Sequence, residues 1–168
     1  SHAIAEVARM AERVLGLAGG QVTGFGPVAA ILSDREAGAA LGDEETVSLI
    51  EARHEAVEPD GLSRLAFTGG TILVPALSIA VGQDVRLLIR ARDVMIATGR
   101  PEGLSALNIL SARVRSLTDL GATACEVRLD CGGARLLARI TQRSARALGL
   151  APGAACHAIL KSVALARD

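Results

Sequence analysis

The hydrophobic pattern of this chain changes at Thr46, and this change constrains the fold more than any other feature of the sequence. From Thr46 onward, apolar residues recur at every second position in short runs, which is the period of a β-strand with one buried face. Glycines separate the runs, at Gly61, at residues 69–70 and at Gly82, and the same texture resumes over residues 106–166. Short strands with glycine turns between them predict small antiparallel barrels or sandwiches.

Two segments about seventy residues apart resemble each other and indicate an internal repeat. In residues 81–90 and 152–161, a glycine is followed eight residues later by a basic residue that ends an apolar run. The basic residue is Arg90 in the first segment and Lys161 in the second, and a short apolar tail follows each. The pattern predicts two copies of one β unit. The alternative is that any two strands after a glycine turn look alike.

Charge and composition exclude several classes of protein. The 168 residues carry a formal net charge of zero and a pI near 6.8, so no global field attracts nucleic acid or an acidic membrane. Phe25 and Phe67 are the only aromatic residues, which argues against a single-strand nucleic-acid binder. The apolar runs are short and interrupted, and the N-terminus lacks a signal-peptide pattern. We expect a soluble cytosolic domain with no nucleic-acid partner and no direct membrane insertion.

Residues 1–33 have a different pattern from the β-like remainder. Apolar residues from Ile4 to Val14 recur at three- and four-residue spacing, which predicts an amphipathic helix. A glycine pair at residues 19–20, flanked by apolar runs, predicts a tight hairpin. A Gly-Pro step at residues 26–27 predicts the start of a short helix.

Composition along the chain divides it into four predicted segments. They are an N-terminal α/β tail (1–33), a polar linker (34–45), a first β module (46–98) and a second β module (99–168). The fold class we expect is mainly β, with two small barrel modules preceded by a short α/β tail.

The cysteines and histidines point to neither catalysis nor metal binding. Three cysteines are an odd number, so they cannot form a complete disulfide framework within one chain. Cys125 and Cys131 have the wrong spacing for a zinc knuckle and no histidine near them in sequence, so we expect buried apolar thiols and no metal site. His54 and His157 fall in strand-like sequence and are expected to be solvated or half-buried. With no specific Ser-His-Asp or Cys-His arrangement, we expect no catalytic residues.

Three polar clusters interrupt the strand-like segments of the second β module. They are residues 105–108, which open with Ser105; the hydroxyl pair Thr141 and Ser144; and Lys161 with Ser162. Lys161 is the only lysine, because the other 17 basic residues are arginine. A compact positive charge with several neutral donors suits a dianion. We expect the three clusters to converge when the strands close on each other.

Two of the clusters also have a simpler interpretation. Thr141 precedes a short helical pattern that Gly149 ends, so it is a good N-cap, and the free N–H groups of that helix start would receive an oxyanion. Thr141 is equally well explained as a cap alone. Lys161 can be a solvated lysine at a strand end.

Residues 105–166 resemble the molybdate-binding Mop module, which is related to TOBE domains. The module pairs a Ser-Ala-x-Asn opening with an Ile-Thr-x-x-Ser segment and a Lys-Ser close, and this chain has them at residues 105–108, 140–144 and 161–162. Residues 46–98 resemble a companion half-module.

Residues 1–33 resemble the end of an ABC-transporter ATPase domain. In such domains a Ser-His pair precedes a Glu-Val-Ala helix, and a strand-glycine hairpin and a Gly-Pro turn follow, as at residues 1–2, 6–8, 17–20 and 26–27 here. Nearly the whole chain is therefore similar to the C-terminal part of the ATP-binding subunit of a molybdate importer.

The resemblance implies a regulatory TOBE/Mop region with OB-like β modules that binds molybdate or tungstate where two subunits meet. The implied oxyanion ligands are Ser105, Thr141, Ser144, Lys161 and Ser162. It also implies a cytoplasmic homodimer at the inner face of the membrane, joined to membrane-spanning subunits through an ATPase domain outside this chain. Sulfate, another tetrahedral dianion, fits the sequence as well as molybdate or tungstate does.

Three further observations on the sequence limit these interpretations. Walker A, Walker B and signature motifs are missing, and the one lysine, Lys161, cannot belong to a Walker A loop, so we expect no ATPase activity, no tightly bound cofactor, and ATP only in the intact parent. Many Mop modules carry Arg where Leu107 stands, which removes a bidentate donor and a charge. The alternative function is therefore a dimerisation scaffold without oxyanion. Residues 1–45 supply one helix and a hairpin, which disfavours a helix-turn-helix transcription regulator.

Overall fold

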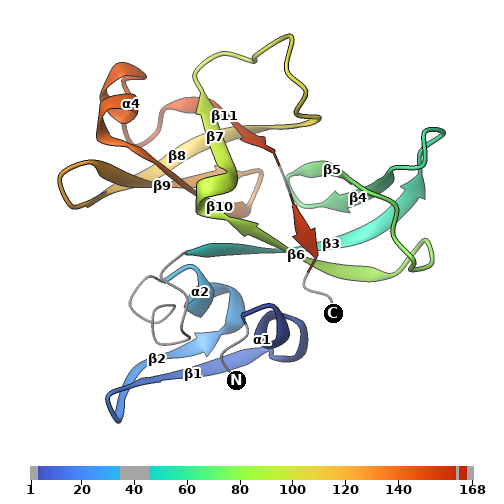
Figure 1. The fold of residues 1–168 in the computed structure, drawn as a ribbon, viewed down its shortest axis with the longest axis horizontal. Helices are drawn as coiled ribbons and strands as arrows, with labels where there is room; N and C mark the ends of the chain where they lie inside the picture. The colour runs from blue at the N-terminus through green and yellow to red at the C-terminus, as the bar shows by residue number, and fades with distance from the viewer. Residues whose placement is uncertain (1–3, 35–45, 162, 166–168) are drawn as a thin grey trace.

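The chain forms a two-stranded hairpin near its N-terminus and two five-stranded sheets (Figure 1). The computed structural model describes residues 4–34, 46–161 and 163–165. Most of the predicted linker lies outside the described residues, as do His2 and Ser162. The prediction of a mainly β chain that begins with a short α/β tail is confirmed.

Residues 4–34 form a small unit, called the N-terminal unit below. Its elements are α1 (Ile4–Met10), β1 (Arg13–Ala18), β2 (Gln21–Pro27) and α2 (Val28–Leu32). The predicted hairpin turns at Gly19 and Gly20, which both have a positive φ that favours glycine. The first helix is shorter than predicted, because the chain enters β1 at Arg13, and Met10 is exposed rather than buried.

Two repeats of five strands each follow the N-terminal unit, and they differ in where a short helix is inserted. The first repeat comprises β3 (Val47–Val57), β4 (Ser63–Phe67), β5 (Gly70–Val74), β6 (Asp84–Arg90), the 3-10 turn η1 (Ala91–Asp93) and β7 (Val94–Ala97). The second repeat comprises β8 (Asn108–Leu120), β9 (Ala124–Cys131), β10 (Ala134–Thr141), the helix α4 (Gln142–Ala147), β11 (Ala155–Leu160) and β12 (Ala164–Leu165). Segments 81–90 and 152–161, singled out in the sequence, end in the corresponding strands β6 and β11.

The two repeats exchange their last strands. The first sheet has the order β12-β6-β3-β4-β5, and the second has the order β10-β9-β8-β11-β7. When the strands of each repeat are matched in chain order, the two sheets have the same arrangement, which confirms the predicted internal repeat. However, β7 pairs with β11 of the second repeat, and β12 pairs with β6 of the first. Each five-stranded sheet therefore contains strands from both predicted β modules.

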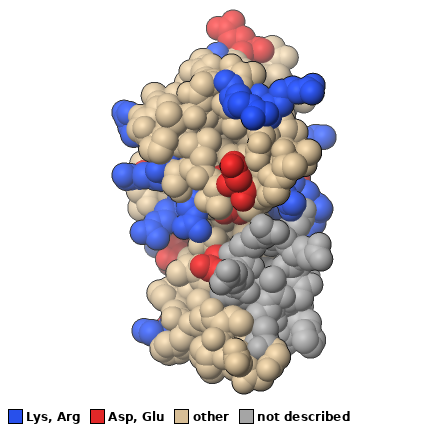
Figure 2. All heavy atoms as spheres, turned by 90° about the vertical axis from the view of Figure 1, so that its left-hand side faces the viewer, with Lys and Arg blue, Asp and Glu red and all other residues tan. Residues whose placement is uncertain are grey.

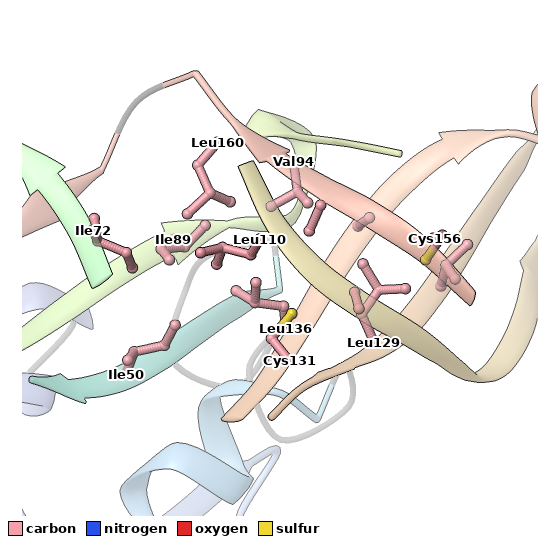
Figure 3. Packing of buried hydrophobic residues seen from close by; sticks show 14 of the residues in the cluster. Ile50, Ile72, Ile89, Val94, Leu110, Leu129, Cys131, Leu136, Cys156 and Leu160 are labelled. Atoms are coloured by element: carbon pink, nitrogen blue, oxygen red, sulfur yellow. The ribbon is translucent and has the colours of Figure 1, made fainter. Parts of the chain in front are cut away.

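One apolar core joins the two sheets. Figure 3 shows side chains from both sheets in this layer, including Ile72 and Ile89 from the first and Leu129 and Leu136 from the second. Each of these four side chains is at most 1% exposed. Burying a side chain of this size stabilises a fold by about 1.5–3 kcal/mol. Because the core residues come from both repeats, we expect the two sheets to unfold together.

A second apolar cluster attaches the N-terminal unit to the outer face of the first sheet. Ile31 and Leu32 of α2 pack against Val47 of β3 and Leu88 of β6. The alternation along β3 explains this arrangement, since Val47 faces the N-terminal unit and Ile50 faces the core between the sheets. The first sheet is therefore covered on both faces near the start of β3.

The β4–β5 and β9–β10 hairpins touch at their tips. A Cβ atom on Gly69 would overlap the carbonyl oxygen of Cys131, and a Cβ on Gly132 would lie 2.9 Å from the Cα of Gly69. Gly132 also has a φ of 62°. Glycine is therefore required at both positions, because the two backbones approach too closely for a side chain.

His54 is more buried than the sequence suggested. Its side chain on β3 is 1% exposed and points into the core, with Nδ1 3.2 Å from the carbonyl oxygen of Ile79 and Nε2 without a hydrogen-bond partner in the described structure. The prediction of a solvated or half-buried residue is wrong here, because the segment that connects β5 to β6 covers this end of the sheet. His157 on β11 is half-buried, as predicted.

Candidate functional site

Thr141 and Ser144 form a hydroxyl pair where β10 ends and α4 begins. Thr141 has extended backbone angles and its Oγ1 accepts a hydrogen bond from the backbone N–H of Ser144 at 3.0 Å, so it is the predicted N-cap. The two hydroxyl oxygens are 2.9 Å apart, so one donates to the other and one hydroxyl proton is left to donate outward. The helix is six residues long, so the hydroxyls, rather than a large helix dipole, are what this end offers a ligand.

Lys161 and Ser105 lie near the other end of the second repeat. Lys161 directly follows β11, is exposed, and donates its backbone N–H to the carbonyl oxygen of Asp93 at 3.4 Å. Ser105 is exposed in the segment that leads into β8, three residues before Asn108. The register places Leu160 directly opposite Asn108, so Lys161 and Ser105 flank the same pair of strands.

The strand β8 separates these two groups of side chains. Its first residue, Asn108, pairs with Leu160 beside Lys161, whereas its last residue, Leu120, pairs with Ala124, which in turn pairs with Thr141. A strand of thirteen residues spans about 40 Å along its path. The expectation that the clusters converge within one chain is therefore wrong, because β8 holds the hydroxyl pair and the lysine at its opposite ends.

Asn108 belongs to the Ser-Ala-x-Asn opening, and its side chain links the two sheets. Its amide oxygen accepts the backbone N–H of Leu73 at 2.7 Å, and its amide nitrogen donates to the carbonyl oxygen of Leu73 at 2.8 Å. Leu73 lies on the edge strand β5, so the amide takes the place of a neighbouring strand. The Asn108 amide is therefore committed to the fold.

The first repeat has a counterpart of this contact that sequence reasoning missed. The Oγ of Ser48 on β3 accepts the backbone N–H of Leu137 on β10 at 2.8 Å. Leu73 and Leu137 each lie three residues into the second strand of a matching hairpin. Ser48 is therefore the equivalent of Asn108. Aligning the two repeats strand by strand is the signal that would have identified it.

Leu107, which stands where many Mop modules carry Arg, is 63% exposed. It is next to Asn108 and two residues from Ser105, so it lies beside the predicted ligands. An apolar side chain here supplies neither charge nor hydrogen bonds to an oxyanion. Among the predicted ligands, Lys161 is the one that carries a positive charge.

The thiols behave as the sequence predicted. Cys125, Cys131 and Cys156 are free and buried. Burial raises the pKa of the Cys131 thiol to about 12, so it stays protonated at neutral pH and is a poor nucleophile. Within the described residues, no group of three or more His, Cys, Asp and Glu side chains is placed to hold a metal ion. None of the helices in the described part of the chain is long and apolar enough to cross a membrane.

Charged side chains are dispersed over the face of the molecule that Figure 2 shows. On the face in Figure 2, groups of basic side chains lie apart, with carboxylates among them and much uncharged surface between. On the outer face of the second sheet, Arg115 pairs with Asp130 through its Nε at 3.0 Å. A bond from the N–H of Gly133 and the Arg115 guanidinium lower the pKa of Asp130. No large field of one sign is therefore visible among the described residues on this face.

Comparison with known proteins identifies the class to which this fold belongs. The family model of the TOBE domain matches residues 104–166, which is the second repeat with its preceding Ser105 segment. Among solved structures, the chain is similar to the cytoplasmic molybdate-binding protein ModG in a form with molybdate bound, with a TM-score of 0.61 and 27% identity over 70% of this chain and 94% of ModG. The second repeat is therefore a TOBE domain.

Relatives along nearly the whole sequence make the identification more specific. The chain is 46% identical to the molybdenum import ATP-binding protein ModC of Rhizobium johnstonii, 42% to ModC of Mesorhizobium japonicum and 40% to ModC 1 of Azotobacter vinelandii, over 98% or 99% of its length. Nearly the whole chain is therefore similar to part of the molybdenum import ATP-binding proteins named ModC. It spans about half the length of these relatives, 45% or 46%.

Proposed function

We propose that this chain is the regulatory part of the ATP-binding subunit of a molybdenum importer, and that it binds molybdate or tungstate between two copies of itself. Ser105, Lys161 and Ser162 of one copy would face Thr141 and Ser144 of the other. The observation that carries the proposal is the position of the lysine and the hydroxyl pair at opposite ends of β8. An isologous dimer brings such ends together twice, once at each of two equivalent sites.

The proposed ligands have the chemistry that a tetrahedral dianion requires. One lysine at about 4 Å from a unit negative charge contributes about 4 kcal/mol at an intermediate dielectric, and desolvation opposes this gain. Hydroxyl donors from both copies would offset the lost hydration of the dianion. The outward hydroxyl of the Thr141–Ser144 pair is one such donor.

Residues 1–33 are proposed to belong to the ATPase domain, most of which lies outside this chain. The hairpin of the N-terminal unit exposes the apolar side chains of Leu15, Leu17, Val22 and Phe25, each at least half exposed. An isolated two-stranded hairpin is marginal in water, and an open apolar patch of this kind marks a contact surface. ATP hydrolysis, the contact with membrane-spanning subunits and a position at the inner membrane face would belong to the intact parent protein.

Calorimetric titration with molybdate tests the proposal, with sulfate as competitor. We expect a Lys161→Ala variant and a Thr141→Ala, Ser144→Ala double variant each to lose binding. An equal mixture of the two variants should recover about a quarter of the sites, because half of the dimers are mixed and each has one intact site. Arg143→Ala, an exposed change on the same helix α4, is the control.

The mixing step separates a shared site from a site within one chain. If all ligands came from one copy, the mixture would recover no sites. Unchanged affinity in the Lys161→Ala variant would remove the lysine from the site. A folded dimer that gives no heat with molybdate would contradict oxyanion binding altogether.

The second candidate function is a dimerisation scaffold without a bound oxyanion, and the exposed Leu107 favours it. An apolar residue that is 63% exposed next to the proposed ligands suits a contact between copies better than an anion site. A dimer whose thermal stability does not respond to molybdate would support this function. In that case, Leu107→Asp should weaken the dimer.

A further inference from the structure

Arg86 connects the first sheet to the N-terminal unit through the end of α1. Its Nη1 atom donates to the carbonyl oxygens of Ala8 and Ala11 at 2.9 Å each, and lies 3.5 Å from that of Arg9. The last carbonyls of a helix have no partner within it and carry a partial negative charge. A guanidinium therefore suits this position. We call this set of bonds the Arg86 clamp.

The first sheet orients the guanidinium of the clamp. Glu51 lies opposite Arg86 on β3, with its Oε1 3.6 Å from the Arg86 Nη2. The side chain of Arg86 is 25% exposed, whereas that of Glu51 is largely exposed. One end of the guanidinium thus faces the sheet and the other faces α1. Together with the apolar contacts of α2, the clamp gives the N-terminal unit a second attachment to the first sheet.

The second repeat has no such clamp at the equivalent position. The pair Ser48–Ile89 of the first repeat matches the pair Asn108–Leu160 of the second. Arg86 lies three residues before Ile89, and its counterpart three residues before Leu160 is His157, which pairs with Ser111. Ser111 is exposed, and within the described residues no helix makes an extensive contact with β8 or β11. The arginine is therefore not required by the β fold. It is present in the repeat that carries the N-terminal unit.

A short path leads from the proposed oxyanion ligands to the clamp. Four residues after Lys161, Leu165 of β12 pairs with Leu87 of β6, which is the neighbour of Arg86. The strand β12 has only two residues, so its pairing is easily biased by what happens on either side of it. A ligand held by Lys161 would restrain the chain that leads into this strand, next to the clamp.

We propose that Arg86 is a positioning residue that transmits oxyanion binding to the N-terminal unit, and through it to the ATP-binding part of the parent protein. The proposal rests on the proposed function above. Occupied ligand sites favour paired β12, and paired β12 holds β6 and the clamp in place. A ligand shifts such an equilibrium only by its different affinity for the two arrangements, so removing the clamp should uncouple hydrolysis from binding.

The test measures molybdate binding and molybdate-dependent ATP hydrolysis in the full-length protein assembled with its membrane-spanning subunits. We expect Arg86→Ala to bind molybdate within about twofold of the unmodified affinity and to reduce the molybdate-induced change in hydrolysis at least about fivefold. Arg86→Lys keeps the charge without the planar fork and should respond to an intermediate degree. Arg53→Ala is the matched control, because Arg53 lies on the same face of the sheet, is exposed and pairs with Asp84 at 3.5 Å.

Hydrogen exchange gives a second measurement that a merely structural role would not affect. In the unmodified protein, molybdate should slow amide exchange in α1, and in Arg86→Ala it should not. If Arg86→Ala does not fold, Glu51→Gln and Arg86→Lys provide the same comparison. A full hydrolysis response in a folded Arg86→Ala protein would overturn the clamp proposal while the ligand site stands. Absence of molybdate binding in the unmodified protein would instead overturn the proposed function, and the coupling with it.

Discussion

The two repeats have the same strand order but carry different groups at their strand ends. Leu65 in the first repeat and Leu129 in the second occupy matching positions in the shared core, and both are at most 1% exposed. Counting along the matched hairpins, Thr141 of the second repeat corresponds to Leu77 of the first. An apolar alternation with glycine tips is thus enough for the fold, and the proposed ligand chemistry depends on a few residues outside that pattern.

The outer faces of the two sheets differ in the same way. Arg86 in the first repeat contacts a helix, and the equivalent His157 in the second does not. The first repeat is therefore specialised for attachment to the N-terminal unit. The second is specialised for the polar clusters that we propose bind the oxyanion. Each repeat keeps the shared topology and adds one set of contacts to it.

Truncating a leucine of the shared core should cause the largest loss of stability and so gives the strongest test of this comparison. Leu65→Ala and Leu129→Ala should each lower the free energy of unfolding by about 2–5 kcal/mol, because each leaves a cavity among fully buried neighbours. Since the sheets exchange strands, both variants should shift one cooperative transition. Urea unfolding followed by far-UV circular dichroism measures this, because the chain has no Trp or Tyr to report by fluorescence. Two separate transitions would show that the repeats fold independently.

Removing the side-chain hydrogen bonds that link the two sheets should lower the free energy of unfolding by less, and by different amounts in the two repeats. Asn108→Ala removes two hydrogen bonds to Leu73, whereas Ser48→Ala removes one to Leu137. We expect losses of about 1–3 kcal/mol for Asn108→Ala and about 1 kcal/mol for Ser48→Ala, since each leaves a backbone group of an edge strand unpaired. Urea midpoints of the two variants measure the difference. Equal losses would mean that the second bond of Asn108 adds nothing.

The smallest effect concerns pH and is confined to the second repeat. Asp130 has a lowered pKa because of the Gly133 N–H and Arg115, whereas the matching residue in the first repeat is Ala66. A lowered folded pKa means that the ionised carboxylate stabilises the fold above its ordinary value of 3.8, and that this contribution is lost as the pH falls through the folded value. Asp130→Asn should therefore be less stable than the unmodified chain near neutral pH. The gap in melting temperature should close under acid conditions, and a gap that widens there would contradict the assignment.

Local features of the sequence predicted a large part of the fold. The alternation after Thr46 and the glycine pairs at residues 19–20 and 69–70 located strands and turns, because side-chain period and positive φ are properties of a few consecutive residues. The cap at Thr141 was also predicted correctly, since its partner Ser144 is three residues away. The burial of His54 was not, because the segment that covers it is more than twenty residues further along the chain.

The sequence by itself determined which segments are strands, that two similar β units follow one another, and which polar residues could serve an anion. Only the tertiary structure decided that β7 and β12 exchange sheets, that β8 holds Thr141 and Lys161 apart, and that Arg86 contacts α1. The physical reason is the distance along the chain over which the deciding interactions act. Strand propensity and turn geometry are set within a few residues, whereas the choice of partner strand depends on burying apolar surface contributed by the whole chain.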